Sequence, residues 1–256
     1  MTSRDVYSAF FYGHTVESEN FSLDFSEGAA ELQASLEIGD YSLTTLLLQV
    51  KEQLNNAGAL AYTVAVNRNT RIVTISADGD FELLAVSGSR HGTSVLGLLG
   101  FTTDKTGAST YTATEPCGLA YFPQFWLQDY VATKYWIESV DASVSVSSSG
   151  KVEVVKFGSQ AFMECNFKYI SNIAMPGYGP FINNQNALED VISFLTFAID
   201  KKSIEFMEDS SNPNIFETMI LEATPESSSG TAFKLKENRA AAGFFDSGVL
   251  KFRKVT

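Results

Sequence analysis

An amphipathic helix is predicted by the stretch SLTTLLLQVKEQLNNAG, residues 42–58. Its apolar residues recur at the spacing of one helix face: Leu43, Leu46, Leu47, Val50 and Leu54. Ser42 is a typical N-cap residue, and Gly58 is a typical stop after the last helical residue. We therefore expect a helix over about residues 43–57, with one face buried in the core.

Strand patterns lie on both sides of this helix. Residues 31–38 alternate between polar and apolar side chains, which indicates a half-buried strand. Residues 62–66 and 72–75 are two runs rich in β-branched residues and joined by a polar turn, which is typical of a β-hairpin. The sequence DGD at 78–80 predicts a further turn, after which residues 81–84 begin another strand.

The second half of the chain also combines several strands with one helix. Residues 144–146 and 152–157 flank a Ser-Ser-Ser-Gly turn, as in a hairpin. Asn186 and Glu189 resemble a capping box, and the apolar stripe that follows predicts a helix over about residues 187–200. Further strands are expected at 160–170, 204–207, 215–223, 232–235 and 249–255.

The remaining segments are less regular. Residues 1–30 are rich in aromatic side chains and fit no helical period, so we expect an extended N-terminal arm or an irregular strand. This arm packs either on its own domain or on a neighbouring subunit. Residues 102–117, rich in Thr, Ser, Gly and Ala, predict a loop or an edge extension. A strand is expected at 120–127, followed by a connection, and residues 174–185 predict a second loop.

Together these patterns indicate an α+β fold, mainly an antiparallel β-sandwich or barrel with one main helix in each half. The expected organisation is an N-terminal arm at 1–30, a β-rich domain at 31–135 and a second β-rich domain at 136–256. The boundary between the two domains is expected near residues 128–140. One split barrel with insertions would give the same pattern, so that alternative stays open.

The composition is that of an acidic protein with a substantial core. Hydrophobic residues make up 45% of the 256 residues, which excludes disorder as the main state. Lys plus Arg is 18 and Asp plus Glu is 30, so the net charge is 18 − 30 = −12 and no basic stripe is available for nucleic acid. Because no apolar run of about 18 residues occurs, we expect no membrane span. The first five residues have no apolar core, so we expect no secretion signal and synthesis in a cytoplasm.

No residue pattern predicts a metal or a cofactor. The two histidines, His14 and His91, have no second ligand at metal-binding spacing. Cys117 and Cys165 form no CxxC pair, and we expect both to be buried free thiols. Arg90 and His91 lie in a Gly-rich turn that either binds an anion or is a solvated loop.

No residue pattern predicts catalysis either. Asp24 with Glu27, and Glu208 with Asp209, offer pairs for acid–base chemistry, but 30 acidic residues create such pairs by chance. We interpret them as solvated carboxylates, assign no catalytic, cofactor-binding or metal-binding residues, and expect no enzyme. Polar strands and Ser/Thr/Gly-rich loops instead favour a structural role in which neighbours in an assembly cover these surfaces.

Eight stretches carry a resemblance to known proteins. They are GDYSLT at 39–44, YTVAVN at 62–67, RIVTIS at 71–76, GTS at 92–94 with LLGF at 98–101, DKTGA at 104–108, GKVEVVKFG at 150–158, IEFM at 204–207 and GVLKFR at 248–253. As a set, they resemble structural proteins of tailed bacteriophages that are encoded among the tail and baseplate genes. The resemblance covers most of the chain, its motifs are structural, and none is a catalytic signature.

The resemblance implies a non-enzymatic protein of the virion, synthesised in the bacterial host cytoplasm. Its implied role is a tail or baseplate ring component, distal-tail or tube-related, built from β-sandwich or barrel domains. Its implied partners are copies of itself in a hexamer or trimer and other phage tail, baseplate or neck proteins. An acidic ring could line a channel through which DNA slides, because like charge repels phosphate.

Three alternatives stay open. The first is a head decoration or head–tail connector protein. The second, from another class, is a carbohydrate-binding module for host attachment, which would use exposed aromatics such as Trp126, Trp136 and Tyr178. The third is an enzyme that acts on cell-wall glycan, for which Glu208 would be the residue to test.

Overall fold

The computed structural model of this chain describes residues 7–28, 30–123, 132–168, 170–171, 188–237 and 243–255. It is a mainly antiparallel β protein, 46% strand, with two helices, one in each half, which confirms the predicted α+β class. The strands are β1 (Ala9–Tyr12), β2 (Thr15–Val16), β3 (Ser22–Ser26), β4 (Glu31–Ser35), β5 (Gly39–Asp40), β6 (Thr63–Asn67), β7 (Ile72–Leu83), β8 (Lys105–Thr112), β9 (Leu119–Tyr121), β10 (Ala132–Val146), β11 (Val152–Phe167), β12 (Ile204–Met207), β13 (Phe216–Ala223), β14 (Lys236–Glu237), β15 (Phe245–Asp246) and β16 (Val249–Lys254). The helices are α1 (Leu43–Ala57) and α2 (Leu188–Ile199), and η1 (His91–Thr93) is a short 3-10 helix.

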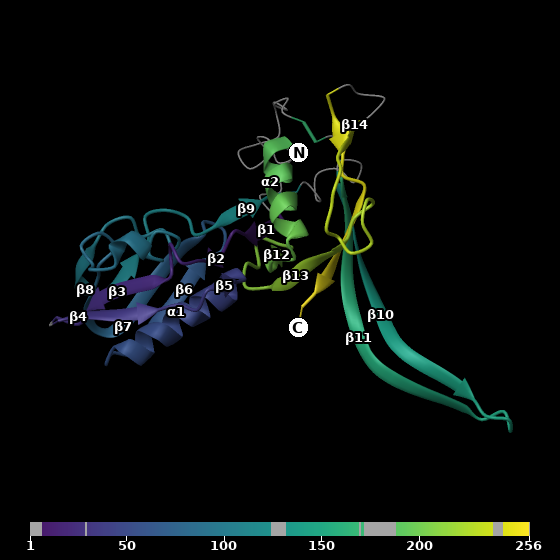
Figure 1. Ribbon diagram of the computed structural model, residues 1–256, viewed down its shortest axis with the longest axis horizontal. Helices are drawn as coiled ribbons and strands as arrows, with labels where there is room; N and C mark the ends of the chain where they lie inside the picture. Colours follow the sequence, from purple (N-terminus) through teal and green to yellow (C-terminus); the bar gives the residue numbers. More distant parts are fainter. Residues whose placement is uncertain are drawn as a thin grey trace. The chain divides into compact units, whose positions relative to one another are not determined.

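The chain forms two compact units, both discontinuous in sequence (Figure 1). The α1 unit comprises Phe10–Ala120 and Ser203–Phe216. The hairpin unit comprises Met1–Ala9, Tyr121–Lys202 and Glu217–Thr256. This division differs from the single boundary expected near residues 128–140. Local periodicity shows where elements begin and end. It does not show that β12, far along the sequence, belongs to the α1 unit.

Helix α1 forms where the sequence predicts it, and its predicted stripe is buried. The Ser42 side chain accepts a hydrogen bond from the backbone N–H of Thr45, and the Thr45 hydroxyl accepts one from the backbone N–H of Ser42. This reciprocal capping box satisfies amides that the first helical turn leaves without partners. The buried residues are the predicted ones: Leu43, Leu46, Leu47, Val50 and Leu54. Helix α1 packs on β4 and β6.

The sheet of the α1 unit runs in the order β4-β3-β7-β6, and β8 also pairs with β7. The predicted hairpin is confirmed, with Val64 of β6 opposite Ile75 of β7. Of the two alternatives for residues 102–117, the edge extension is observed, because β8 lies within that range and pairs with β7. A row of edge-to-face aromatic rings fills the interior: Phe25, Tyr62, Phe81 and Tyr111.

The aromatic N-terminal segment is part of the core, so for the described residues 7–28 the strand alternative is observed and the extended arm is wrong. Every residue of β1 and β3 is buried, and Phe10, Phe11 and Phe25 have no exposed surface. Strands that are buried on both faces show no alternation of polar and apolar residues, which is why the pattern suggested an arm. Of the two alternatives for this segment, packing on its own chain is the one observed.

The turn predicted at 78–80 is also wrong, because β7 continues without interruption to Leu83. The register between β7 and β8 shifts between Ser76 and Phe81, so the DGD sequence forms an irregularity inside a strand. Gly79 permits a close approach there, since a Cβ atom would lie 2.9 Å from Cδ2 of Leu60. Asp78 accepts a hydrogen bond from the backbone N–H of Ala61 at 2.9 Å.

In the hairpin unit, the strands β10, β11, β16 and β13 are neighbours in that order. Helix α2 buries Val191, Leu195 and Ala198 of the predicted stripe, together with Phe194, which the prediction did not include. Ile192, a member of the predicted stripe, is instead 39% exposed. The Phe194 ring stacks on Tyr121 with 5.1 Å between centroids, and it lies 6.1 Å from the ring of Phe252 on β16. Tyr121 also meets Phe167 of β11 edge-on at 5.2 Å. These rings join the helix, β9 and the sheet in one core.

Three expectations for this half need correction. The strand expected at 160–170 is the second part of β11, which begins at Val152, and β10 already begins at Ala132 within the expected connection. Residues 232–235 form no strand, and β14 begins only after them, at Lys236. The expected loop at 174–185 and the Asn186 cap lie outside the described residues.

Candidate functional site: a long hairpin with one apolar face

The β10–β11 hairpin is the largest exposed feature of the hairpin unit (Figure 1). Its register runs from the pair Ala132–Phe167 to the pair Val146–Val152. On its other side β11 pairs with β16 only from Phe162 to Asn166, and β10 is the last strand in the sheet order. Within the described part of the chain, residues 136–146 and 152–161 therefore pair only with each other.

Four valines share one face at the tip of this hairpin. Val144 lies opposite Val154, and Val146 lies opposite Val152. Directly opposed residues of an antiparallel pair project from the same face, and so do residues two apart on one strand. The four side chains are 63%, 54%, 65% and 58% exposed in the order just given. We name these four residues the valine face.

The two sides of the tip differ in chemistry. On the valine face the next pair is Ala142 with Lys156. The opposite side presents Ser143 with Val155 and Ser145 with Glu153. The tip is therefore amphipathic, with one apolar side that carries a single cation. A contiguous exposed apolar surface of this kind marks an interaction site in a folded protein.

Hydrogen bonds and a bulge shape the hairpin. At the tip, the backbone N–H of Ser147 donates to the carbonyl of Lys151, and that of Gly150 donates to Ser147, both at 2.9 Å. Gly150 has φ +80°, a left-handed conformation that favours glycine. Farther down, the register shifts between Asp141 and Ala142, and the hairpin curves along its length (Figure 1).

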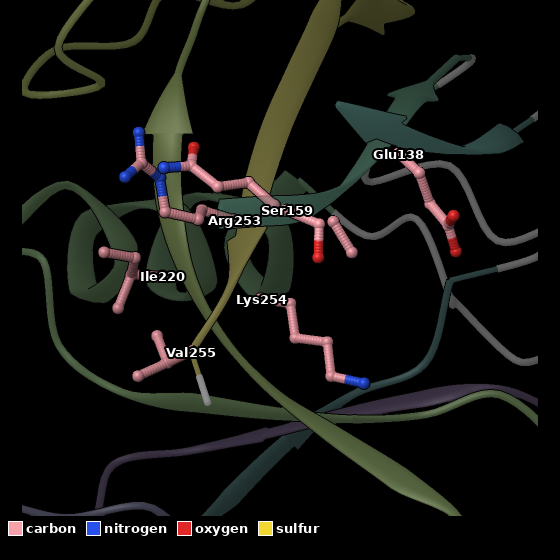
Figure 2. Close-up of a pocket in the computed structure, with 8 residues that line it drawn as sticks. Glu138, Ser159, Ile220, Arg253, Lys254 and Val255 are labelled. Atoms are coloured by element: carbon pink, nitrogen blue, oxygen red, sulfur yellow. The ribbon is translucent and has the colours of Figure 1, made fainter. Parts of the chain in front are cut away.

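A hollow of about 610 Å³ lies at the base of the hairpin (Figure 2). It is lined by Glu138, Ser159, Gln160, Ala161, Ile220, Arg253, Lys254 and Val255. We name it the basal hollow. Because β11 leaves its pairing with β16 at Phe162, the hollow lies where the β11 edge becomes free beside the end of β16. Its apolar surface comes from Ala161, Ile220 and Val255.

Two of the three charged residues of the basal hollow are already paired. The Arg253 guanidinium lies 2.5 Å from a Glu222 carboxylate oxygen, and the Lys254 amine lies 2.5 Å from Glu217. The carboxylate of Glu138 has no ion-pair or hydrogen-bond partner among the described residues, and the same holds for the ammonium of Lys156. Glu138 and Lys156 are therefore two uncompensated charges of opposite sign on the described part of the hairpin.

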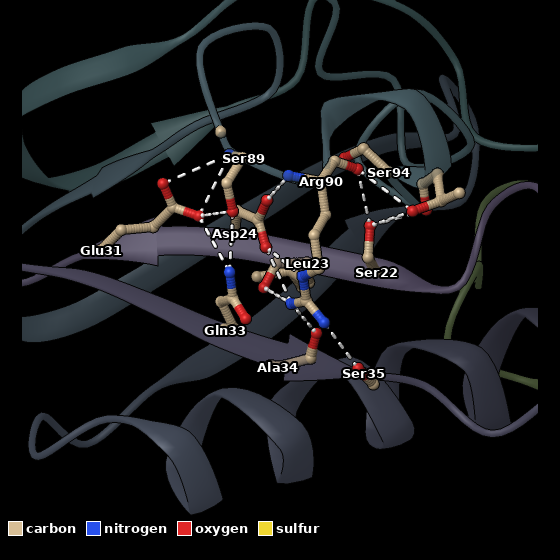
Figure 3. Close-up of polar contacts among 12 residues, drawn as sticks. Ser22, Leu23, Asp24, Glu31, Gln33, Ala34, Ser35, Ser89, Arg90 and Ser94 are labelled. Carbon is tan, nitrogen blue, oxygen red and sulfur yellow. Dashed lines mark hydrogen bonds and ion pairs between the residues drawn. The ribbon is translucent and has the colours of Figure 1, made fainter.

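Arg90, a candidate anion ligand, is instead held by its own chain (Figure 3). Its Nε donates to the Asp24 carboxylate at 2.8 Å, and its backbone N–H donates to the same carboxylate at 2.6 Å. Its Nη2 donates to the Ala34 carbonyl at 2.7 Å, and its Nη1 donates to the Ser35 hydroxyl at 3.0 Å. The guanidinium is therefore already hydrogen-bonded within the chain. This argues against anion binding, the first of the two alternatives for this turn, because Arg90 would be its main cation.

The two acidic pairs singled out in the sequence also have separate structural partners. Asp24 binds Arg90, whereas Glu27 accepts hydrogen bonds from the backbone of Ala59 and Leu60 and from the Tyr62 hydroxyl, all at 3.0 Å. Burial alone would raise the pKa of Glu27, but these donors lower it. In the second pair, Asp209 accepts a hydrogen bond from the backbone of Ser211 at 2.8 Å, which stabilises a turn.

His14 and the two cysteines are buried, as expected for the thiols. Burial, together with the nearby Arg71 cation, lowers the pKa of His14 to about 4. Neither ring nitrogen of His14 has a hydrogen-bond partner among the residues that the structure describes. Cys117 and Cys165 are free, and burial raises the pKa of both thiols, that of Cys117 to about 12 despite the opposing effect of Arg71. Neither thiol is suited to nucleophilic chemistry at neutral pH.

The buried ion pair between Glu205 and Arg68 was not anticipated from the sequence. Glu205 of β12 is fully buried, and its carboxylate accepts a hydrogen bond from the backbone N–H of Thr44 in the first turn of α1 at 2.6 Å. Its other oxygen lies 3.3 Å from the guanidinium of Arg68, which is stacked 3.7 Å from the centre of the Phe216 ring. This cluster holds β12 against the first turn of α1, so its role is structural.

The valine face was missed as a unit, although its signal was present. The sequence showed valines at 144, 146, 152 and 154 on either side of a tight turn. Pairing across that turn sets the register and therefore places all four on one side. What the sequence did not show is that the rest of the sheet ends below them and leaves this side uncovered.

Comparisons with models of known protein families and with curated protein sequences find no match for this chain. Within the described residues, no group of three or more potential metal ligands is brought together. In the same part of the chain, neither helix has the length and apolar character needed to cross a bilayer.

Proposed function

We propose that this protein is a non-enzymatic structural protein of a tailed bacteriophage virion. Its role is that of a tail or baseplate ring component, distal-tail or tube-related, that assembles into a homo-oligomer with other tail, baseplate or neck proteins as neighbours. The observation that carries the proposal is the β10–β11 hairpin, with an uncovered valine face and two unpaired strand edges.

The physical argument concerns what such a hairpin requires. A two-stranded ribbon is only marginally stable in water, and unpaired edges with exposed apolar residues promote association. Native proteins usually protect such edges with short strands, charges or covering elements. Here Lys156 is the one charged residue beside the valine face on this side of the tip. One charge protects an exposed apolar surface poorly, so a partner surface is needed to cover the valine face. This need supports an assembly subunit.

The sequence resemblance supports the class of assembly. The eight stretches that resemble phage tail and baseplate proteins include GKVEVVKFG at 150–158, which forms most of the first half of β11. The net charge of −12 suits a ring around a DNA channel, because it disfavours adhesion to phosphate. The role in the tail rests on this resemblance and on charge.

Light scattering of the purified protein, with negative-stain images of the same peak, tests the proposal. A ring of six 28.0-kDa chains has a mass of 6 × 28.0 = 168 kDa, and a ring of three has 3 × 28.0 = 84 kDa. A closed ring with a central hole is the expected result. A monomer that stays monomeric up to high protein concentration would overturn the self-assembly on which the proposal depends.

A second candidate function is carbohydrate binding during host attachment. One observation favours it: the Trp136 side chain on β10 is 41% exposed, and exposed aromatic rings stack on sugars. Trp126 and Tyr178, the other aromatics considered, lie outside the described residues. Glycan-array binding that is lost in Trp136→Ala would favour this function over the ring.

A further inference from the structure

We propose that the valine face of one copy docks into the basal hollow of a neighbouring copy. This inference rests on the proposed function, since it names the partner surface for the hairpin within the oligomer. We propose it as a head-to-tail contact, in which each copy donates its valine face to one neighbour and its basal hollow to the other, because such heterologous contacts build rings.

The shapes of the two surfaces suit each other. The hairpin tip is a narrow ribbon whose valines project from one side, and the basal hollow is a concave region of about 610 Å³. Ala161, Ile220 and Val255 offer apolar contacts inside it, and the edge of β11 beside it has no partner strand up to Phe162. An incoming strand therefore finds both apolar contact and free backbone groups.

The charges of the two surfaces are complementary. Lys156 is the single charged residue among the three pairs on this side of the tip, from Ala142–Lys156 to Val146–Val152, and its ammonium has no partner among the described side chains. Of the charged residues that line the hollow, only Glu138 lacks a partner in the described part of the chain. Docking as proposed brings these opposite charges to the same interface, which favours this register over others.

The alternative, in which two valine faces pack on each other, lacks this match. A two-fold contact would bring two Lys156 side chains to one interface, and the paired positions of the tip on that side supply no acidic residue. Like charges at a partly desolvated interface oppose binding. The observations therefore favour the basal hollow over a second valine face.

Charge exchange provides the first test. Lys156→Glu and Glu138→Lys should each weaken assembly at least tenfold, measured as the concentration at which half of the chains are oligomeric. The double variant Lys156→Glu/Glu138→Lys should restore most of the affinity. The two positions of one chain lie about four residues apart along the hairpin, or roughly 13 Å, so rescue reports a contact between chains.

Disulfide trapping provides the second test. Proteins that carry Val146→Cys and Ser159→Cys singly are mixed and oxidised, with one of them tagged so that mixed dimers are recognised by mass. Ser145→Cys is the matched control, because it is adjacent to Val146 but projects from the opposite side. The native Cys117 and Cys165 are buried and do not compete.

The expected result is a mixed disulfide between Val146→Cys and Ser159→Cys, with far less product from Ser145→Cys. Homodimers of Val146→Cys as the main product would overturn the inference in favour of face-to-face packing. A ring that forms without the mixed disulfide and without charge rescue would overturn the docking but leave the proposed function standing. Absence of any oligomer would overturn both.

Discussion

At the scale of single residues, buried charge is held by partners that are distant in sequence. Asp24 is 2% exposed and binds Arg90, which also ties the loop before η1 to the carbonyl of Ala34. Removal of one member of such a pair leaves the other charge buried without compensation. The local turn at 88–92 was visible in the sequence, but its partner on β3 was not, because contact between positions 66 residues apart leaves no local pattern.

The variant Arg90→Met tests this pair. We expect it to lower the free energy of unfolding by about 3–5 kcal/mol, because the Asp24 carboxylate stays buried without a cation. The double variant Asp24→Asn/Arg90→Met should lose less than Arg90→Met alone, since no charge then remains. Urea unfolding of the three proteins measures both differences, and equal losses in the single and double variants would contradict the coupling.

His14 makes the stability of the protein depend on pH. Its pKa is lowered from 6.5 to about 4 in the folded state, so the unfolded chain binds the proton more tightly. The contribution of neutral His14 is therefore fully present above pH 6.5 and is lost as the pH falls toward 4. A shift of this size corresponds to a loss on the order of 3 kcal/mol.

The variant His14→Met removes this titration. Its unfolding free energy should change less than that of the native protein between pH 6.5 and 4.5. Acidic residues with lowered pKa, such as Glu27, act mainly at lower pH, so this window isolates the histidine. Parallel pH profiles for the two proteins would show that His14 is not the group responsible.

At the scale of elements, the best predictions came from amphipathic patterns. Helix α1 was predictable to the residue, since its stripe, cap and stop all lie within one stretch of sequence. The all-buried strands β1 and β3 were not, because they carry no alternation. The hairpin was predictable near its turn, whereas its lower part was obscured by irregular aromatics and by the bulge at Asp141.

The stripe of helix α1 can be tested with two neighbouring leucines. Leu47 is 7% exposed and Leu48 is 50% exposed. We expect Leu47→Ala to lower the free energy of unfolding by about 2–5 kcal/mol, because a buried leucine is truncated. The control Leu48→Ala should change it by less than about 0.5–1 kcal/mol. Equal effects would mean that the helix does not pack by this stripe.

The valine face can be tested in the same way. Val144→Ser/Val154→Ser removes apolar surface on one side of the tip, and Val155→Ser does so on the other. The first variant should shift the oligomer toward monomer, while the second should leave the mass distribution largely unchanged. At a protein concentration too low for assembly, thermal unfolding should be nearly the same in both, because these side chains are exposed in the single chain. Equal dissociation by the two variants would contradict a one-sided contact.

At the scale of the whole molecule, the net charge of −12 opposes assembly. Copies that approach each other repel, and salt screens this repulsion beyond about 8–10 Å. We therefore expect the oligomeric fraction to rise with salt between roughly 0.05 and 0.5 M, where the shorter Debye lengths leave mainly the apolar contact. Sedimentation at several salt concentrations measures the oligomeric fraction. Dissociation by salt would instead assign the main attraction to charge pairs.

The division into units was the part of the fold least accessible to sequence analysis. The fold class follows from composition and periodicity, and both helices were found by their stripes. Unit membership depends on the buried contacts of Glu205 with Arg68 and Thr44, which join positions more than 130 residues apart. For the candidate surface, the valine pattern was visible, but its exposure depends on where β16 ends.

The discontinuous units also govern when the chain can fold during its synthesis. The α1 unit needs β12, so the ribosome must translate the whole hairpin before the carboxylate of Glu205 can meet the start of α1. The hairpin in turn waits for β16, which follows it in chain order, before it gains a neighbour in its own sheet. Nascent chains therefore carry an unsupported apolar ribbon until β16 has been translated, and a chain truncated before Val249 would expose this ribbon without its anchor.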